Sequence, residues 1–138
     1  MYHCHMYFYY IGDHQQLLET IKQLEPAEQF TYTFLSSGVP EPQLTAQADV
    51  ILADLRSLDA AAAAKLAREK KPGAELIALA DKEQAGLLDL SLLQDIWTLP
   101  LTERELRFHF LRWQQACKIS KDLWQANHFL EATINSVP

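Results

Sequence analysis

The sequence predicts an α/β fold, in which a doubly wound, five-stranded parallel sheet is covered by helices on both faces and followed by an extended C-terminal helix. Three observations predict it. Five short apolar segments alternate with segments whose apolar residues recur at helical spacing. The apolar segments are hydrophobic on both faces, which is typical of parallel strands between two helix layers. Finally, residues 102–135 contain neither Pro nor Gly and favour one long helix.

Each strand prediction has a compositional reason. The first is rich in aromatic residues, the second alternates aromatic and threonine residues, and the third and fourth are runs of aliphatic residues. The second is expected to end at Ser36-Ser37-Gly38, and Pro100 closes the fifth. The predicted strands are Met6–Ile11, Phe30–Leu35, Val50–Leu55, Glu75–Ala80 and Ile96–Leu99.

The helices between the strands follow from spacing and from their stop signals. Prolines limit the second to a short or irregular helix, and Pro72-Gly73 ends the third, whose run of alanines favours close packing on the sheet. Thr102 and Glu105 form a capping-box pattern at the start of the long helix. The predicted helical segments are His14–Leu24, Val39–Ala48, Leu58–Lys71 and Lys82–Leu93.

The C-terminal helix divides the chain into a globular part, residues 1–115, and a helical linker, residues 116–138. Its first turns present Leu106, Phe110 and Trp113 at a spacing that suits packing on the sheet. A heptad-like stripe follows, and it predicts a coiled coil and a homodimer; the alternative is that this segment folds back on its own domain. The stripe consists of Ala116, Ile119, Leu123, Ala126 and Leu130.

Composition and charge exclude several classes of protein. Residues 1–99 carry 7 Lys/Arg against 14 Asp/Glu, whereas residues 100–138 carry 5 against 4, so the chain has no basic patch for nucleic acid or an anionic membrane. No apolar run is long enough to span a membrane, and the N-terminus lacks signal-peptide features. Cys4 and Cys117 are far apart in sequence, which favours unpaired cysteines and a cytoplasmic location.

Functional residues of an open parallel sheet are expected at the carboxyl ends of its strands. Those positions are occupied here by Gly12 and Asp13, Asp54, Ala80 and Leu99. Asp54 is the most informative, because a carboxylate at the end of an apolar strand is costly unless it is solvated, paired or metal-bound.

Two segments resemble response-regulator receiver domains over about residues 5–115. Asp49–Leu55 (DVILADL) resembles their third strand, which ends in the phosphoacceptor aspartate, and Asp95–Leu101 (DIWTLPL) resembles their fifth. The resemblance implies the strand order 2-1-3-4-5. It also implies that Asp54 would accept a phosphoryl group with the help of Mg²⁺, held by acidic residues after the first strand.

Several positions depart from the pattern of this family. Its acidic pair is reduced to Gly12 and Asp13, its hydroxyl position is Ala80, and its lysine position is Leu99. Leu99 supplies no cation to counter a phosphoryl group and Ala80 donates no hydrogen bond. We therefore expect a degenerate pseudo-receiver that needs no cofactor, in which Asp54 is solvated or caps a helix. The alternative is a functional phosphoacceptor with Mg²⁺ on Asp13 and Asp54.

Other sites carry less specific signals. His3 and His5 share one strand face and His14 lies nearby in the predicted sheet, but we interpret them as solvent-facing residues without a metal. No nucleophile elbow indicates hydrolase chemistry. A further possibility is that the space left by Gly12, Ala80 and Leu99 binds a small apolar or heterocyclic ligand.

The last ten residues, Phe129–Pro138, resemble the helix that leads into a PAS sensory domain. This second resemblance implies an N-terminal fragment of a multidomain bacterial signalling protein, with a downstream output such as a diguanylate cyclase or a histidine kinase. The expected function is a non-catalytic regulatory and dimerisation domain that passes a signal through its C-terminal helix.

Overall fold

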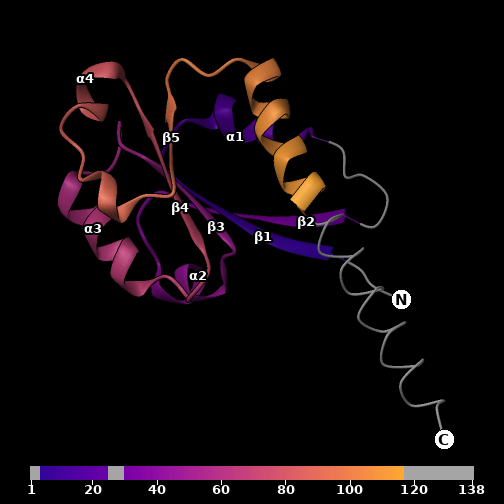
Figure 1. Cartoon of the computed structure of the whole chain (residues 1–138), viewed down its shortest axis with the longest axis horizontal. Helices are drawn as coiled ribbons and strands as arrows, with labels where there is room; N and C mark the ends of the chain where they lie inside the picture. The colour runs from indigo at the N-terminus through magenta and orange to yellow at the C-terminus, as the bar shows by residue number, and fades with distance from the viewer. Residues whose placement is uncertain (1–3, 25–29, 117–138) are drawn as a thin grey trace, which may run out of the picture.

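The computed structural model describes residues 4–24 and 30–116. Its core is a sheet of five parallel strands in the order β2-β1-β3-β4-β5 (Figure 1), which confirms the predicted fold and strand order. The strands are β1 (Cys4–Ile11), β2 (Phe30–Ser37), β3 (Val50–Asp54), β4 (Glu75–Ala80) and β5 (Asp95–Thr98). The helices are α1 (Gln15–Lys22), α2 (Pro42–Gln47), α3 (Ala60–Glu69), α4 (Lys82–Ala85), the short 3₁₀ helix η1 (Leu90–Leu92) and a C-terminal helix described over residues 103–116.

Apolar side chains cover both faces of the sheet. On one face, Phe8 and Leu52 pack in a cluster with α1 and the C-terminal helix. On the other face, Tyr9 and Ile51 lie in the cluster that includes Leu66 of α3, and Ala63 of α3 packs against the alanines of β4. Both faces are therefore buried, as the unbroken apolar runs predicted.

The second strand is longer than predicted. It continues through Ser36 and Ser37, which pair with Tyr10 and Ile11 of β1. Backbone pairing with the buried end of β1 outweighs the low strand propensity of serine, so the break falls at Gly38.

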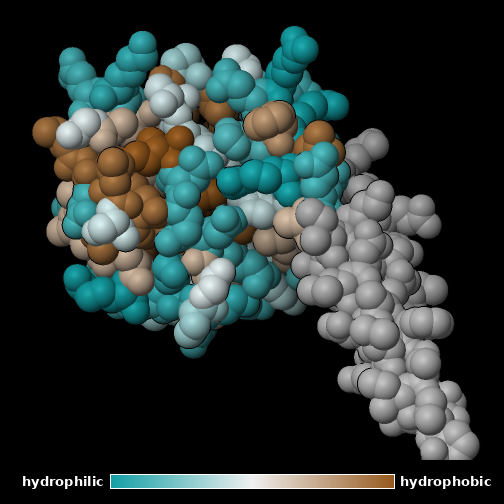
Figure 2. Space-filling model, in the orientation of Figure 1, coloured by the Kyte–Doolittle hydropathy of each residue, from teal (hydrophilic) through white to brown (hydrophobic). Residues whose placement is uncertain are grey.

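The predicted helix Lys82–Leu93 is wrong as a continuous element. The structure has only the single turn of α4, which ends at Gly86, and then η1. Asp89 accepts a hydrogen bond from the backbone N–H of Ser91, at 3.0 Å, and so starts a new turn instead of continuing the helix. Leu87, which lies between the two turns, and Leu90, the first residue of η1, are exposed, in a region where Figure 2 shows apolar surface near α4.

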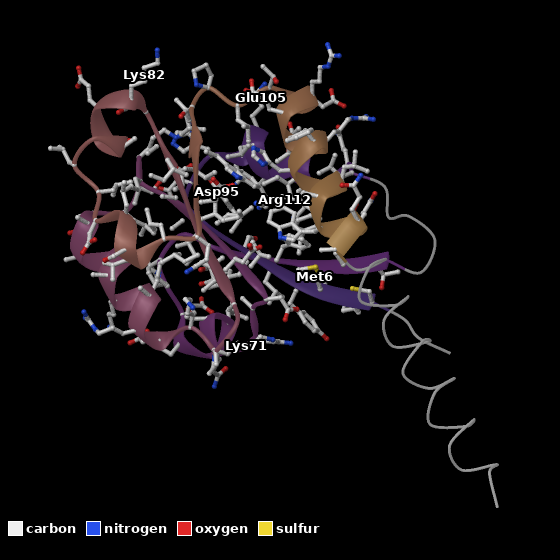
Figure 3. All side chains as sticks on the ribbon, viewed as in Figure 1. Met6, Lys71, Lys82, Asp95, Glu105 and Arg112 are labelled. Carbon is white, nitrogen blue, oxygen red and sulfur yellow. The ribbon has the colours of Figure 1, made fainter. Side chains whose placement is uncertain are left out.

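The C-terminal helix begins and docks as predicted. The hydroxyl of Thr102 accepts a hydrogen bond from the backbone N–H of Glu105, at 3.1 Å, which caps the first turn. Leu106, Phe110 and Trp113 are all buried against the sheet. Arg112 of this helix also forms an ion pair with Asp95 of β5, with 3.6 Å between Nη2 and Oδ2 (Figure 3). The described part of the helix is therefore fixed to the domain.

Other predictions concern cysteines, the linker and membranes. Cys4 is disulfide-bonded, which corrects the expectation of unpaired cysteines; separation along the chain does not decide separation in a fold.

Ala116 ends the described helix and is exposed, whereas Cys117 and the rest of the heptad stripe (Ile119, Leu123, Ala126 and Leu130) lie outside the described residues. Within the described ranges, every helix is too short or too polar to cross a membrane.

Candidate functional site

The carboxyl edge of the sheet brings Asp54 next to β1. Asp54 is the last residue of β3, and its residue surface is 0% exposed. It is one of two buried polar residues in the described part of the chain. The expectation that this carboxylate is solvated or caps a helix is therefore wrong, because it lies under side chains from β1 and from the loop after β3.

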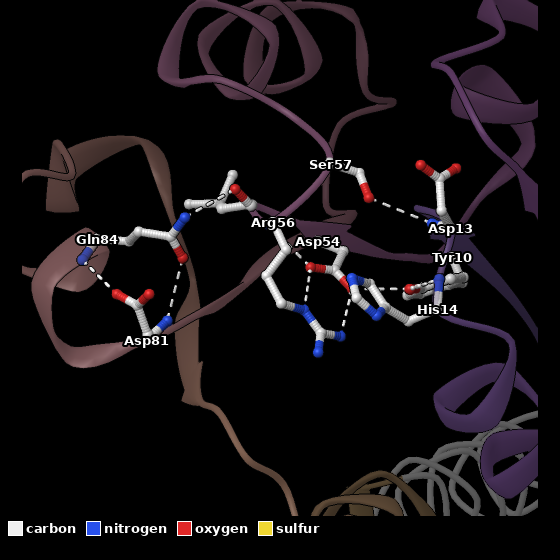
Figure 4. Close-up of polar contacts among 9 residues, drawn as sticks. Tyr10, Asp13, His14, Asp54, Arg56, Ser57, Asp81 and Gln84 are labelled. Carbon is white, nitrogen blue, oxygen red and sulfur yellow. Dashed lines mark hydrogen bonds and ion pairs between the residues drawn. The ribbon is translucent and has the colours of Figure 1, made fainter.

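Arg56 is the main partner of this buried carboxylate. Its Nε donates to Asp54 Oδ1 at 2.9 Å and its Nη2 donates to Asp54 Oδ2 at 2.7 Å, so one guanidinium contacts both oxygens (Figure 4). The backbone N–H of Arg56 adds a third bond to Oδ1 at 3.0 Å. A bidentate arginine–carboxylate pair combines charge with fixed geometry. The loop after β3 thus supplies its own counter-ion, two residues from the carboxylate.

Tyr10 closes the site from β1. Its hydroxyl donates to Asp54 Oδ2 at 2.8 Å, and it accepts a hydrogen bond from the backbone N–H of His14 at 3.3 Å. The ring belongs to the same apolar cluster as Phe8 and Leu52. The tyrosine therefore joins the hydrophobic core to the polar end of the sheet.

The pKa values follow from this arrangement. Burial by itself would raise the pKa of Asp54, but the hydrogen bonds from Arg56 and Tyr10 outweigh burial and lower it below 3.8. The hydrogen bond to Asp54 raises the pKa of Arg56, while burial together with that same carboxylate raises the pKa of Tyr10. At neutral pH the site is thus a carboxylate, a guanidinium and a neutral phenol.

Gly12 is required by the position of Tyr10. A Cβ atom at Gly12 would lie 2.7 Å from the tyrosine oxygen and 2.8 Å from the Cβ of Asp54. Atoms of the chain already fill the space around this position, so the tyrosine and an acidic side chain at residue 12 exclude each other.

The remaining predicted site residues surround this cluster. Asp13 follows Gly12, and its backbone N–H donates to the hydroxyl of Ser57 at 3.3 Å. Ala80 ends β4, and its carbonyl accepts a hydrogen bond from the N–H of Leu99 at 2.8 Å. The predicted positions therefore do gather at one edge of the sheet, although their roles stay predictions.

The side chains as arranged do not fit a magnesium ion. The carboxylate of Asp13 points away from Asp54 (Figure 4), and both oxygens of Asp54 are bonded to a cationic group. A divalent cation at Asp54 would lie beside the guanidinium of Arg56 and be repelled by it. Among residues 4–24 and 30–116, no group of three or more His, Cys, Asp and Glu side chains is placed to hold a metal ion.

His5, near the amino end of β1, is bonded to β2. The ring of His5 lies within 2.7 Å of the Thr31 hydroxyl and 2.8 Å of the Thr33 hydroxyl. His14, by contrast, precedes α1 at the carboxyl edge, so the two histidines lie at opposite ends of the strand and the expectation that they lie near each other is wrong. His3 lies outside the described residues.

Sequence reasoning missed the two residues that define the site. Tyr10 is one of several aromatic residues in β1, so the sequence pattern indicates a core residue; its ring does lie in the core, but its hydroxyl belongs to the site. Arg56 carried a usable signal, because an arginine two residues after a buried strand-end aspartate can turn back to pair with it.

Comparisons with known proteins agree with this architecture. The chain is similar to the receiver domain of the sensor histidine kinase PA1611 from Pseudomonas aeruginosa PAO1, whose crystal structure has a magnesium ion coordinated in the active site cleft. The TM-score is 0.54 at 20% sequence identity, and the match covers 80% of this chain and 98% of that chain. Neither the family models nor the curated proteins match the sequence. Similarity at this identity concerns the fold, and it shows that the chain has the fold of a response-regulator receiver domain.

Proposed function

We propose that this domain is a degenerate receiver, a non-catalytic regulatory module of a signal-transduction protein, in which Asp54 is a structural residue instead of a phosphoacceptor. The observation that carries the proposal is the complete engagement of Asp54, whose two oxygens receive hydrogen bonds from Arg56 and Tyr10. A nucleophilic carboxylate needs a free oxygen that can approach phosphorus, and here both are occupied.

The charge balance supports the same conclusion. A phosphoryl group on Asp54 would bring about two negative charges, which need a metal ion or several cations. The guanidinium of Arg56 is the one cation in contact with Asp54 among the described residues, and it already neutralises the carboxylate. Ala80 has no hydroxyl and Leu99 has no charge to stabilise the product.

The test is covalent phosphorylation measured by intact mass. We expect the 138-residue chain to remain unmodified when it is incubated with acetyl phosphate and Mg²⁺. The variant Arg56→Ser, which removes the counter-ion, is the companion sample and shows whether the guanidinium is the block. Asp59→Asn is a matched control, because Asp59 caps α3 and lies outside the site.

A functional phosphoacceptor is the second candidate. It is favoured by the position of Asp54 at the end of the central strand β3 and by the magnesium ion in the active site cleft of the similar receiver domain. In that case Arg56 would have to swing away so that Asp13 and Asp54 could share Mg²⁺. A stoichiometric adduct on the unmodified chain that is lost in Asp54→Asn would establish this candidate and overturn our preference.

We also propose that the C-terminal helix carries the output. Its inner face is fixed to the domain by Phe110 and Trp113, while Phe108 and Leu111 remain exposed. An exposed apolar face on a docked helix supports pairing with a second copy of the chain. Replacing Leu123 and Leu130 with Glu should convert a dimer into a monomer in light scattering, and an unchanged dimer would contradict the coiled coil.

The wider setting of the domain belongs to the same proposal. It contacts neither nucleic acid nor membrane, and passes its signal to a downstream sensory or output domain of the same protein, such as a diguanylate cyclase or a kinase. Whether the natural protein continues beyond position 138 into such a domain would test this assignment directly.

A further inference from the structure

A cavity of about 480 Å³ opens beside the Asp54 cluster, between α1, Arg56 and the segment that follows β5. All of its lining residues are described, and they come from three parts of the chain. Its volume lies within the range of small-molecule sites, about 300–1,000 Å³. It is a different space from the one predicted around Gly12, which Tyr10 fills.

The floor of this cavity is aliphatic. Leu17 of α1, Leu99 and Leu101 line it, and all three are partly buried against the main apolar cluster. Because their inner sides are fixed by the core, they present a preformed apolar surface to whatever enters. Such a floor suits the flat or aliphatic body of a small organic molecule.

The polar rim offers hydrogen-bonding groups. Arg56 lines the cavity together with His14 and Gln16. Its Nε and Nη2 donate hydrogen bonds to Asp54, and the guanidinium has further N–H groups that can donate to a ligand. Among residues 4–24 and 30–116, the side-chain amide of Gln16 makes no hydrogen bond. A ligand that carries a carbonyl or another acceptor can therefore bind at the guanidinium.

The charge at the rim is balanced. Arg56 is paired with Asp54 at 2.7 Å, and Glu103, the acidic residue of the lining, is paired with Arg107 at 2.8 Å. A charged ligand would lose water here without gaining a free counter-charge, which is unfavourable. A neutral ligand avoids this cost.

We propose that this cavity binds a small, neutral, planar organic molecule with a carbonyl acceptor, its body on Leu17, Leu99 and Leu101 and its acceptor at Arg56. The proposal rests on the cavity and not on the state of Asp54, although a bound ligand would contact the arginine that neutralises Asp54. It gives the proposed regulatory domain a chemical input at the same edge of the sheet.

The test uses three probes of one shape and different charge: benzamide, benzoate and benzamidine. Each is titrated into the labelled 138-residue chain and followed by NMR. We expect benzamide to give saturable shifts centred on Leu17, Leu99 and Leu101, with a Kd on the order of millimolar for so small a molecule. Benzoate and benzamidine should bind at least about fivefold more weakly, because their charges are unpaired there.

A pair of matched variants locates the site. Gln16→Trp places a bulky ring at the rim and should abolish the benzamide shifts, whereas Glu19→Trp, on the same helix and outside the lining, should leave them unchanged. The proposal is overturned if benzamide gives no saturable shifts, if they centre elsewhere, or if a charged probe binds equally well. Acetyl phosphate labelling is measured separately, so failure here is distinct from failure of the proposed function.

Discussion

Replacing Arg56 with Met should show that the site contains an internal counter-ion. Methionine keeps a long side chain that can cover the same surface, but it removes both side-chain hydrogen bonds to Asp54. Tyr10 and the backbone N–H of Arg56 still donate to the carboxylate. The variant therefore leaves a fully buried aspartate that retains hydrogen bonds and has no cation.

The size of the effect follows from burial and partial screening. Breaking a buried ion pair costs about 3–5 kcal/mol because one charge is left uncompensated. The side chain of Arg56 is 34% exposed, so solvent already screens part of the interaction. The remaining hydrogen bonds lower the cost further, and we expect the free energy of unfolding to fall by about 2–4 kcal/mol. For a domain of this size that corresponds to roughly 6–16 °C in Tm.

The pH dependence gives a second, independent signature. In the unaltered chain the pKa of Asp54 lies below 3.8, so the stabilisation is complete above that pH and is lost as the pH falls through the lowered pKa. In the variant, burial acts without the guanidinium and raises the pKa of Asp54. The folded variant then binds a proton more readily than the unfolded chain, and its deficit in stability should shrink as the pH falls from about 7 towards about 4.

Thermal unfolding followed by circular dichroism measures both effects. Arg68→Met is the matched control, because Arg68 is an exposed arginine on α3. The variant Asp54→Asn/Arg56→Met should recover part of the loss by removing the buried charge. A Tm within about 2 °C of the unaltered chain, or a deficit that does not change with pH, would refute the assignment of Arg56 as the counter-ion.

Three further predictions concern two residues of the Asp54 site and one histidine of the C-terminal helix. Tyr10→Phe should raise the pKa of Asp54 in a ¹³C NMR titration and cost about 1–2 kcal/mol in chemical unfolding, since one donor is lost. Gly12→Ala should cost about 1–3 kcal/mol in the same assay, because its Cβ would meet Tyr10 and Asp54 at under 3 Å. Burial lowers the pKa of His109 below 6.5, so stability should fall as the pH drops below that value; His109→Phe, which keeps a ring stacked on Trp97, should flatten this dependence between about pH 7 and 5.

The alternation of short apolar segments with helical segments along the chain was sufficient to predict the sheet. Strands such as Val50–Asp54 and Glu75–Ala80 are apolar on both faces, and this pattern has few structural solutions other than a covered parallel sheet. The docking stripe of the C-terminal helix was equally readable, because Leu106, Phe110 and Trp113 repeat at helical spacing. These predictions succeeded because each depends on residues close together in the chain.

Predictions failed for two kinds of reason, local and tertiary. The helix expected over Lys82–Leu93 is interrupted by local features, because Gly86 and the side-chain bond of Asp89 act against its continuation. Ser36 and Ser37 form strand because β1 offers them a complete backbone partner. The disulfide-bonded state of Cys4 likewise depends on neighbours that spacing does not reveal.

The sequence alone determined the fold, the edge of the sheet at which polar residues gather, and the lack of a hydroxyl at Ala80 and of a lysine at Leu99. The tertiary structure decided the state of Asp54 itself. Tyr10 reads as a core aromatic and Arg56 as a loop residue, and only the pairing of β1 with β3 and the turn after β3 bring them onto one carboxylate. The strength of a buried charge pair depends on its geometry and its exclusion from water, and both arise from the packing of residues that are distant in the chain.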